Sequence, residues 1–281
     1  MDSSPRLGAI GRVAQRRPFT SFLVVTFSLS WGVWVGVAAL GLGTSLGVFA
    51  VIPGAFGPPV AALWHVWATG GSPRRWLRTV AGVRGRRRWY AVALLLPVLV
   101  VGVGTLALVA TGRRLIPSVL PLRLVAFFPT VVFMALLGGG QEELGWRGFA
   151  LPRLEHRTTP LTAALALGII WAAWHLPLFY VPGASQYGAS FAPYAVGVVG
   201  LSVVFTWLFN RSASVAVATV LHGSYNASLV LYPLPAGKLT DGAGEVLTFG
   251  AVAVWALALA LVVATRANLG YDPERLPAVP E

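Results

Sequence analysis

Three small groups of polar side chains interrupt stretches of the sequence that are otherwise apolar. They are Gln141, Glu142 and Glu143 with Arg147, then His175, and then His222 with Asn226. An ionisable side chain is costly inside a membrane, so it usually faces a cavity lined by protein and marks a functional site. Carboxylates and imidazoles are also the groups that move protons in catalysis. These residues are therefore the candidate site.

The spacing within the groups suggests different roles for their members. Glu143 and Arg147 are four residues apart and share a helix face, which suits an ion pair. Glu142 points about 100° away and is the freer carboxylate, so in an apolar cavity it can act as a general base on water. His222 and Asn226 also share a face, and their N–H groups suit a developing oxyanion.

The composition assigns the chain to the integral membrane proteins. Of its 281 residues, 56% are hydrophobic and 11% are charged, whereas soluble domains contain about 25% charged residues. The sequence therefore predicts an all-α fold, a polytopic transmembrane helix bundle with an intramembrane active-site cavity. Residues 1–281 are interpreted as a single transmembrane domain, and residues 267–281, which contain three prolines, as a short disordered tail.

We expect about eight transmembrane spans, each close to the roughly 20 residues that cross a bilayer as a helix. The apolar stretches are 19–40, 46–69, 89–111, 123–146, 160–181, 193–209, 213–232 and 246–265. A continuous helix over 121–157 would be too long for one span. We therefore expect an interruption at Pro129, at the glycines 138–140 or at Pro152.

The distribution of basic residues indicates the orientation. Placing both termini in the cytoplasm puts most of the 21 Lys and Arg residues on the inner side, as the positive-inside rule requires. The basic loop 74–88 lies between two spans, where contact with anionic lipid fits better than contact with nucleic acid. We expect a protein of the cell (plasma) membrane, with membrane lipids as partners and no nucleic-acid partner.

The three polar groups should meet at one depth in the membrane. The turn at 156–160 lies about 16 residues from Glu142 and about as far from His175, so both reach a similar height in an antiparallel helical hairpin with a rise of ~1.5 Å per residue. The seventh stretch starts on the same side, near Arg211, which places His222 some 11 residues along it.

Three motifs occur in this order on successive predicted helices: Glu142-Glu143-x-x-x-Arg147, Trp171-x-x-x-His175 and His222-x-x-x-Asn226. Together they resemble the CPBP intramembrane proteases, which include the type II CAAX prenyl endopeptidases and bacterial Abi-type proteins. The resemblance covers roughly 125–232, the expected protease core. One departure is Trp171, where the family commonly has Phe; an aromatic support under the histidine is kept.

The resemblance implies an intramembrane CAAX-type endopeptidase that hydrolyses a peptide bond of a membrane-associated peptide or protein. Glu142 would activate the attacking water with help from His175, and Glu143 with Arg147 would organise the site. His222 and its partner amide Asn226 would stabilise the tetrahedral oxyanion.

The cofactor is left open by the sequence. The family has been described as metalloproteases, and a metal-free mechanism that depends on glutamate has also been proposed for it. Glu142, His175 and His222 could form a three-ligand site for a divalent metal such as zinc, although the sequence has no His-Glu-x-x-His pair. The metal-free mechanism is favoured, because the amide of Asn226 suits hydrogen-bond donation better than coordination.

Other functions are compatible with the same cluster. A non-catalytic regulatory or immunity protein, or a transporter, could use it as an ion-binding or docking site, although no pair of inverted repeats is evident. Glu143 and Arg147 could form a buried ion pair that only locks two helices. Of the remaining histidines, His65 fits an interfacial position beside Trp64 and Trp67, and His156 fits an exposed loop.

Overall fold

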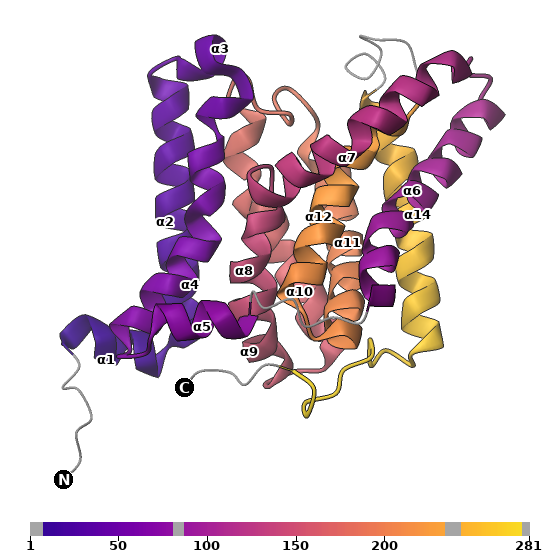
Figure 1. Ribbon diagram of the computed structural model, residues 1–281. Helices are drawn as coiled ribbons and strands as arrows, with labels where there is room; N and C mark the ends of the chain where they lie inside the picture. Colours follow the sequence, from indigo (N-terminus) through magenta and orange to yellow (C-terminus); the bar gives the residue numbers. More distant parts are fainter. Residues whose placement is uncertain (1–7, 81–86, 234–242, 277–281) are drawn as a thin grey trace.

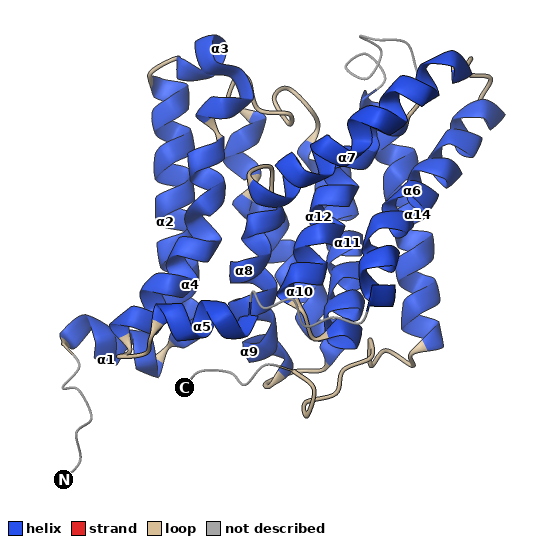
Figure 2. Cartoon of the chain, viewed as in Figure 1, coloured by secondary structure: helices blue, strands red, loops and turns tan. Residues whose placement is uncertain are grey.

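The computed structural model describes residues 8–80, 87–233 and 243–276, and these residues form helices, turns and loops without a strand (Figure 2). The longer helices are α1 (Ala9–Arg16), α2 (Pro18–Ala39), α4 (Gly57–Ala68), α5 (Pro73–Val80), α6 (Arg87–Ala110), α7 (Leu120–Leu136), α10 (Pro160–Trp174), α11 (Phe191–Ser212), α12 (Val215–Ser228) and α14 (Ala243–Ala264). Short helical elements join them: α3 (Leu42–Leu46), η1 (Gly47–Ala50), η2 (Ile52–Phe56), η3 (Pro117–Val119), η4 (Gly140–Glu142), α8 (Glu143–Gly145), η5 (Trp146–Ala150), α9 (Leu151–Glu155), η6 (Leu176–Phe179) and η7 (Leu229–Leu231).

The helices form one bundle whose central elements carry the polar groups. In Figure 1, α2 and α4 lie on one side, α6, α11, α12 and α14 lie on the other, and the chain from α8 to α10 runs between them. Helix α10 packs on α11, α11 packs on α14, and α12 packs on both α6 and α7. Helices α1 and α5 lie across one end of the bundle, the end where α9 finishes (Figure 1).

The expected polytopic helix bundle is confirmed, but the helices differ in length. Four described segments are long and apolar enough to cross a membrane, or five if the bent pair Leu42–Ala50 and Ile52–Ala68 forms one span. The four are Pro18–Ala39, Arg87–Ala110, Pro117–Glu155 and Phe191–Ser212. The remaining apolar helices, Pro160–Trp174, Val215–Leu231 and Gly250–Ala264, are shorter. The expectation of about eight full-length spans is therefore not met by helix length, although all eight stretches contain helix.

The long stretch Pro117–Glu155 is interrupted at its glycines, one of the three positions expected. Helix α7 continues through Pro129 and ends at Leu136, and Pro152 lies in the first turn of α9. Gly139 has a φ of +126°, a conformation that other residues rarely adopt. A π-helical turn follows at Trp146–Ala150, and such turns are frequent at functional sites.

Residues 267–276 follow a defined path, which corrects the prediction of a disordered tail for this part of it. Leu269 is 0% exposed and lies in an apolar cluster with Ala164, Val203, Val204 and Ala258. Burial of this side chain anchors the segment to α10, α11 and α14, which the proline content did not reveal. The remaining tail residues, 277–281, lie outside the described part of the chain.

The two histidines outside the expected site have opposite environments. His156 is exposed, as predicted. His65 is 1% exposed, its ring packs edge-on against Phe149 with centroids 4.8 Å apart, and its Nδ1 lies 3.3 Å from the Ser21 hydroxyl. The interfacial position predicted for His65 is therefore wrong, because α4 turns this side chain toward the bundle while Trp67 is 68% exposed.

Candidate active site

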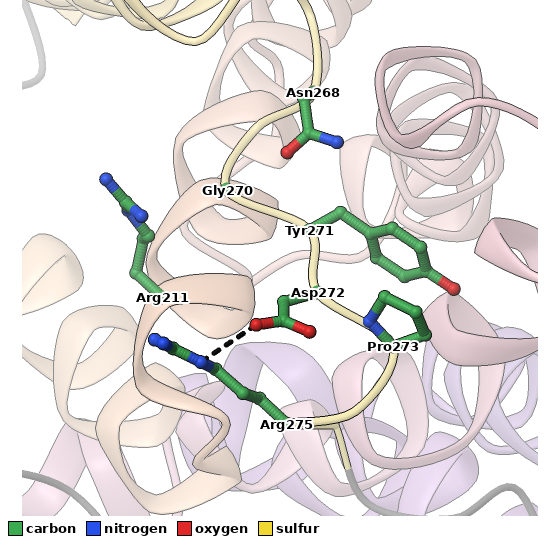
Figure 3. A pocket seen from close by; sticks show the side chains of 7 residues that line it. All are labelled: Arg211, Asn268, Gly270, Tyr271, Asp272, Pro273 and Arg275. Carbon is green, nitrogen blue, oxygen red and sulfur yellow. Dashed lines mark ion pairs between the residues drawn. The ribbon is translucent and has the colours of Figure 1, made fainter.

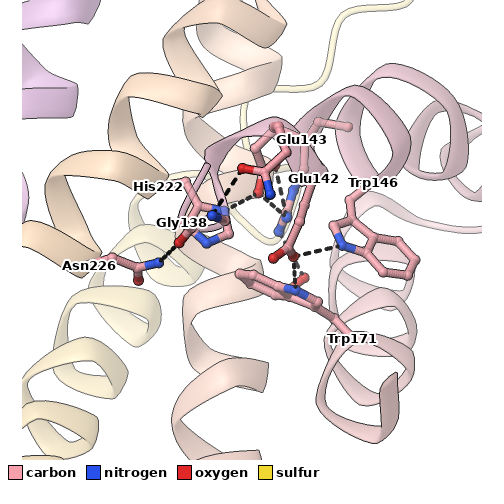
Figure 4. Close-up of polar contacts among 11 residues, drawn as sticks. Gly138, Glu142, Glu143, Trp146, Trp171, His222 and Asn226 are labelled. Atoms are coloured by element: carbon pink, nitrogen blue, oxygen red, sulfur yellow. Dashed lines mark hydrogen bonds and ion pairs between the residues drawn. The ribbon is translucent and has the colours of Figure 1, made fainter. Parts of the chain in front are cut away.

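Glu142 is held through one of its two carboxylate oxygens. Its Oε2 accepts hydrogen bonds from two indole N–H groups, that of Trp171 at 2.9 Å and that of Trp146 at 3.2 Å (Figure 4). No donor from the described residues contacts Oε1. Glu142 as a whole is only 4% exposed. The carboxylate is thus oriented by two neutral donors, with one oxygen left for a substrate or a water molecule.

Glu143 points to a different set of partners. Nη1 of Arg147 lies 3.0 Å from its Oε2 and 3.1 Å from its Oε1, and both side chains are 0% exposed. Nδ1 of His222 lies 2.8 Å from the same Oε1. The expected Glu143–Arg147 ion pair is therefore formed, and it extends across the bundle to α12 through His222.

Arg147 is enclosed by groups that suit a guanidinium. Its Nη2 lies 3.5 Å from the Ser202 hydroxyl on α11. Its Cζ lies 4.8 Å from the ring centroid of Trp171 and 4.7 Å from that of Phe205. Cation–π contact and the carboxylate compensate for the loss of water around the charge. This residue therefore ties the turn after α8 to α10 and α11.

His175 begins the loop after α10 and shares a partner with Glu142. Its Nδ1 lies 2.8 Å from the backbone carbonyl oxygen of Trp171. A carbonyl oxygen can only accept, so Nδ1 carries the proton and Nε2 is an acceptor in the neutral ring. No direct hydrogen bond joins His175 to Glu142 among the described residues. Trp171 instead contacts both of them, one through its carbonyl and one through its indole.

The glycine turn lies against the His222 and Asn226 pair. The Asn226 amide donates to the Gly138 carbonyl at 2.8 Å. A Cβ placed on Gly139 would lie 2.5 Å from Nε2 of His222 and 3.0 Å from Nδ2 of Asn226. The Gly139 amide N–H donates to the side chain of Gln141 at 3.0 Å, which holds the turn in this position. Both candidate donors therefore border the same piece of backbone.

The structure brings the predicted residues into one connected cluster with additional members. Glu143, Arg147 and His222 are joined by direct contacts. Glu142 and His175 are joined to them through Trp171, which also packs on the Arg147 guanidinium. Sequence reasoning did not foresee the hydrogen bond from Trp146 to Glu142, and it missed Ser202 and Phe205. The spacing of four residues between Glu142 and Trp146 could have revealed the first, whereas no local signal connects Arg147 to the two residues of α11.

The residues do not fit the three-ligand metal site considered from the sequence. Within the described ranges, no group of three or more His, Cys, Asp or Glu side chains could hold one ion.

Comparison with known proteins finds a family model that matches the region of the candidate site. Residues 124–228 match the family model described as Type II CAAX prenyl endopeptidase Rce1-like. This part of the chain is therefore similar to the Rce1-like endopeptidases. It includes every site residue predicted from the motifs, and the resemblance to the CPBP proteases is confirmed.

One curated relative of this Rce1-like region is the CAAX prenyl protease 2 of Methanococcus maripaludis. It is 31% identical over 105 residues, which cover 34% of this chain and 38% of the relative. The chain thus matches well under half the length of that protein.

Proposed function

We propose that this integral membrane protein is an intramembrane endopeptidase in which Glu142 activates water. The observation that carries the proposal is the arrangement of its carboxylate, with Oε2 held by two indole N–H groups and Oε1 without a protein donor. A base that is held in this way presents one oxygen in a fixed direction. Positioning of this kind is a prerequisite for general base catalysis.

His175 assists by orienting the same water. Its Nδ1 proton is held by the Trp171 carbonyl, so its Nε2 lone pair can accept a hydrogen bond from water. Because Trp171 contacts both His175 and Glu142, the base and the acceptor are positioned by one residue. Glu143 and Arg147 support the site from the other side through His222.

The chemical steps conserve protons. Glu142 takes a proton from water as the oxygen of that water adds to the carbonyl carbon of the scissile peptide bond. The tetrahedral intermediate then collapses, and the proton passes from Glu142 to the leaving nitrogen, which gives a carboxylic acid and an amine. A carboxyl group that acts first as base and then as acid completes the cycle unchanged.

The oxyanion of the intermediate is stabilised by Asn226 and His222. One N–H of the Asn226 amide is used by the Gly138 carbonyl, and the second remains for the substrate oxygen. His222 directs Nδ1 at Glu143, so it donates from Nε2 only when the ring carries both protons. Donors placed at a developing charge contribute strongly to catalysis.

The substrate class is inferred from the similarity to CAAX endopeptidases, and the orientation from the charge distribution. We infer a peptide or protein anchored in the membrane by a prenylated CAAX-type C-terminus, because the Rce1-like match and the name of the relative both refer to CAAX prenyl processing. The charge distribution supports an orientation with both termini in the cytoplasm, and we propose the plasma membrane as the location.

The test uses the full-length protein in liposomes with a panel of membrane-anchored peptides, prenylated and unprenylated. Wild type and Glu274→Gln, a substitution at an exposed carboxylate outside the site, should cleave, and Glu142→Gln should not. Cleavage by Glu142→Gln would reject the assignment of the base. Peptide binding without cleavage by wild type would favour a non-catalytic protein. Activity that is lost on chelation together with bound zinc, and restored by zinc, would reject the mechanism based on side chains alone.

A further inference from the structure

A polar cavity lies at the end of the bundle where α11 and α14 finish, away from Glu142. Its volume is about 280 Å³, and it is lined by Arg211, Asn268, Gly270, Tyr271, Asp272, Pro273 and Arg275. Figure 3 shows both arginines on one side of the 268–275 segment and the ring of Tyr271 on the other. The proposed peptidase chemistry uses none of these residues.

The lining carries more positive than negative charge. Arg275 pairs with Asp272, with 2.8 Å between Nε and Oδ2, and the same carboxylate accepts the backbone N–H of Glu274 through Oδ1. Asp272 is therefore engaged. Arg211 has no ion pair or side-chain hydrogen bond with the described residues, and its guanidinium is left to a ligand or solvent.

Close packing fixes the position of Arg211. A Cβ on Gly270 would lie 2.5 Å from Cδ of Arg211 and 2.9 Å from Cγ. The stem of the arginine thus lies directly on the glycine backbone, which has a φ of +71°. Glycine adopts this conformation readily and leaves room for the contact. The side chain is directed along the cavity wall by this contact.

The backbone that forms the cavity is unusual. Arg266, Ala267 and Leu269 have φ values of +50°, +63° and +50°, a region that residues other than glycine seldom occupy. Such conformations persist only where the surroundings impose them, and they cluster at binding sites. Two features hold the backbone in this conformation. The Leu269 side chain is buried, and its backbone N–H donates a hydrogen bond to the Thr265 hydroxyl at 3.1 Å.

We propose that this cavity binds a phosphate group, carried by an anionic phospholipid or free in solution. Guanidinium groups match the geometry of phosphate oxygens, and the amide of Asn268 supplies a further donor. Arg211 lies in the last turn of the membrane-spanning helix α11, at the level expected for lipid head groups. Basic pockets at the ends of membrane helices are suited to anionic lipids.

The experiment measures lipid binding by the intact protein. Wild type, Arg211→Gln and Arg157→Gln are compared; Arg157 is exposed in the turn before α10 and does not line the cavity. Binding of phosphatidylglycerol and of phosphatidylcholine is followed by native mass spectrometry and by the thermal midpoint in detergent. Inorganic phosphate at constant ionic strength forms a separate arm.

Arg211→Gln should weaken binding of phosphatidylglycerol by about tenfold or more, as expected for loss of a charge-assisted contact, and Arg157→Gln should bind as wild type does. Arg211→Lys keeps the charge without the planar fork and should fall between them. A response to phosphatidylglycerol alone identifies lipid as the source, and a response to inorganic phosphate that phosphatidylglycerol does not compete with identifies free phosphate. Equal effects of the two Gln variants, or equal binding of both lipids together with no response to inorganic phosphate, would overturn the proposal.

Discussion

Glu143 is the counterion of a guanidinium that has no contact with solvent, and Glu143→Gln removes that charge while keeping the shape. The side chains of Glu143 and Arg147 are both 0% exposed, with Nη1 3.0 Å from Oε2, and His222 loses its carboxylate partner at 2.8 Å in the same change. Removal of one member of a buried pair typically costs about 3–5 kcal/mol, because the remaining charge is uncompensated. We expect the free energy of unfolding to fall by that amount.

Glu142→Gln is the matched comparison at the neighbouring position. The Oε2 atom of Glu142 accepts from two neutral indole N–H groups, and the carbonyl oxygen of glutamine can accept from the same donors. The stability should change by no more than about 1.5 kcal/mol, the net value of one ordinary hydrogen bond. Peptide cleavage should nevertheless be abolished, because an amide cannot take a proton from water.

Both variants are measured in detergent, with unfolding followed by circular dichroism and cleavage followed on the same preparations. The double variant Glu143→Gln with Arg147→Met removes both buried charges and should recover most of the lost stability, since replacement of a whole buried pair is often neutral or better. Identical stability and identical residual activity of the two single variants would refute the division of roles. If the double variant were no more stable than Glu143→Gln, the uncompensated charge of Arg147 would not be the cause of the lost stability.

Other perturbations test the remaining parts of the site and the orientation. Gly139→Ala puts a methyl group 2.5 Å from the nearest imidazole nitrogen of the oxyanion pair and should lower turnover about 10²–10³-fold; Gly36→Ala, with no atom within 4 Å of the new Cβ, is the control and should be unaffected. Trp171→Phe removes one of two N–H donors to the base and should slow cleavage about tenfold; an unchanged rate would mean that the indole does not orient it. Because the chain has no cysteine, a cysteine at exposed Thr158 should react with impermeant reagents only after cells are opened, and one at exposed Arg114 should react from outside. The reverse pattern would invert the topology.

The sequence alone determined the class of protein and the motif residues of the cluster, but not all of its members. The low charge content can only suit a chain whose surface faces lipid, so a helical membrane bundle follows from composition. The spacing of Glu143 and Arg147 is a local property of a helix, and their ion pair is formed as expected. The break beside Glu142 also follows from local chemistry, since only glycine readily adopts the conformation found at Gly139.

Only the tertiary structure decided which side chains meet across the bundle. His222 reaches Glu143 over 79 residues of sequence, and the indole of Trp171 reaches Glu142 over 29. These contacts depend on how helices rotate against one another. Helices that are apolar on all sides carry little pattern to specify that rotation, because lipid and protein interior are similarly apolar. The buried anchor Leu269 was hidden for the same reason, since a single leucine near the C-terminus shows its role only where it packs.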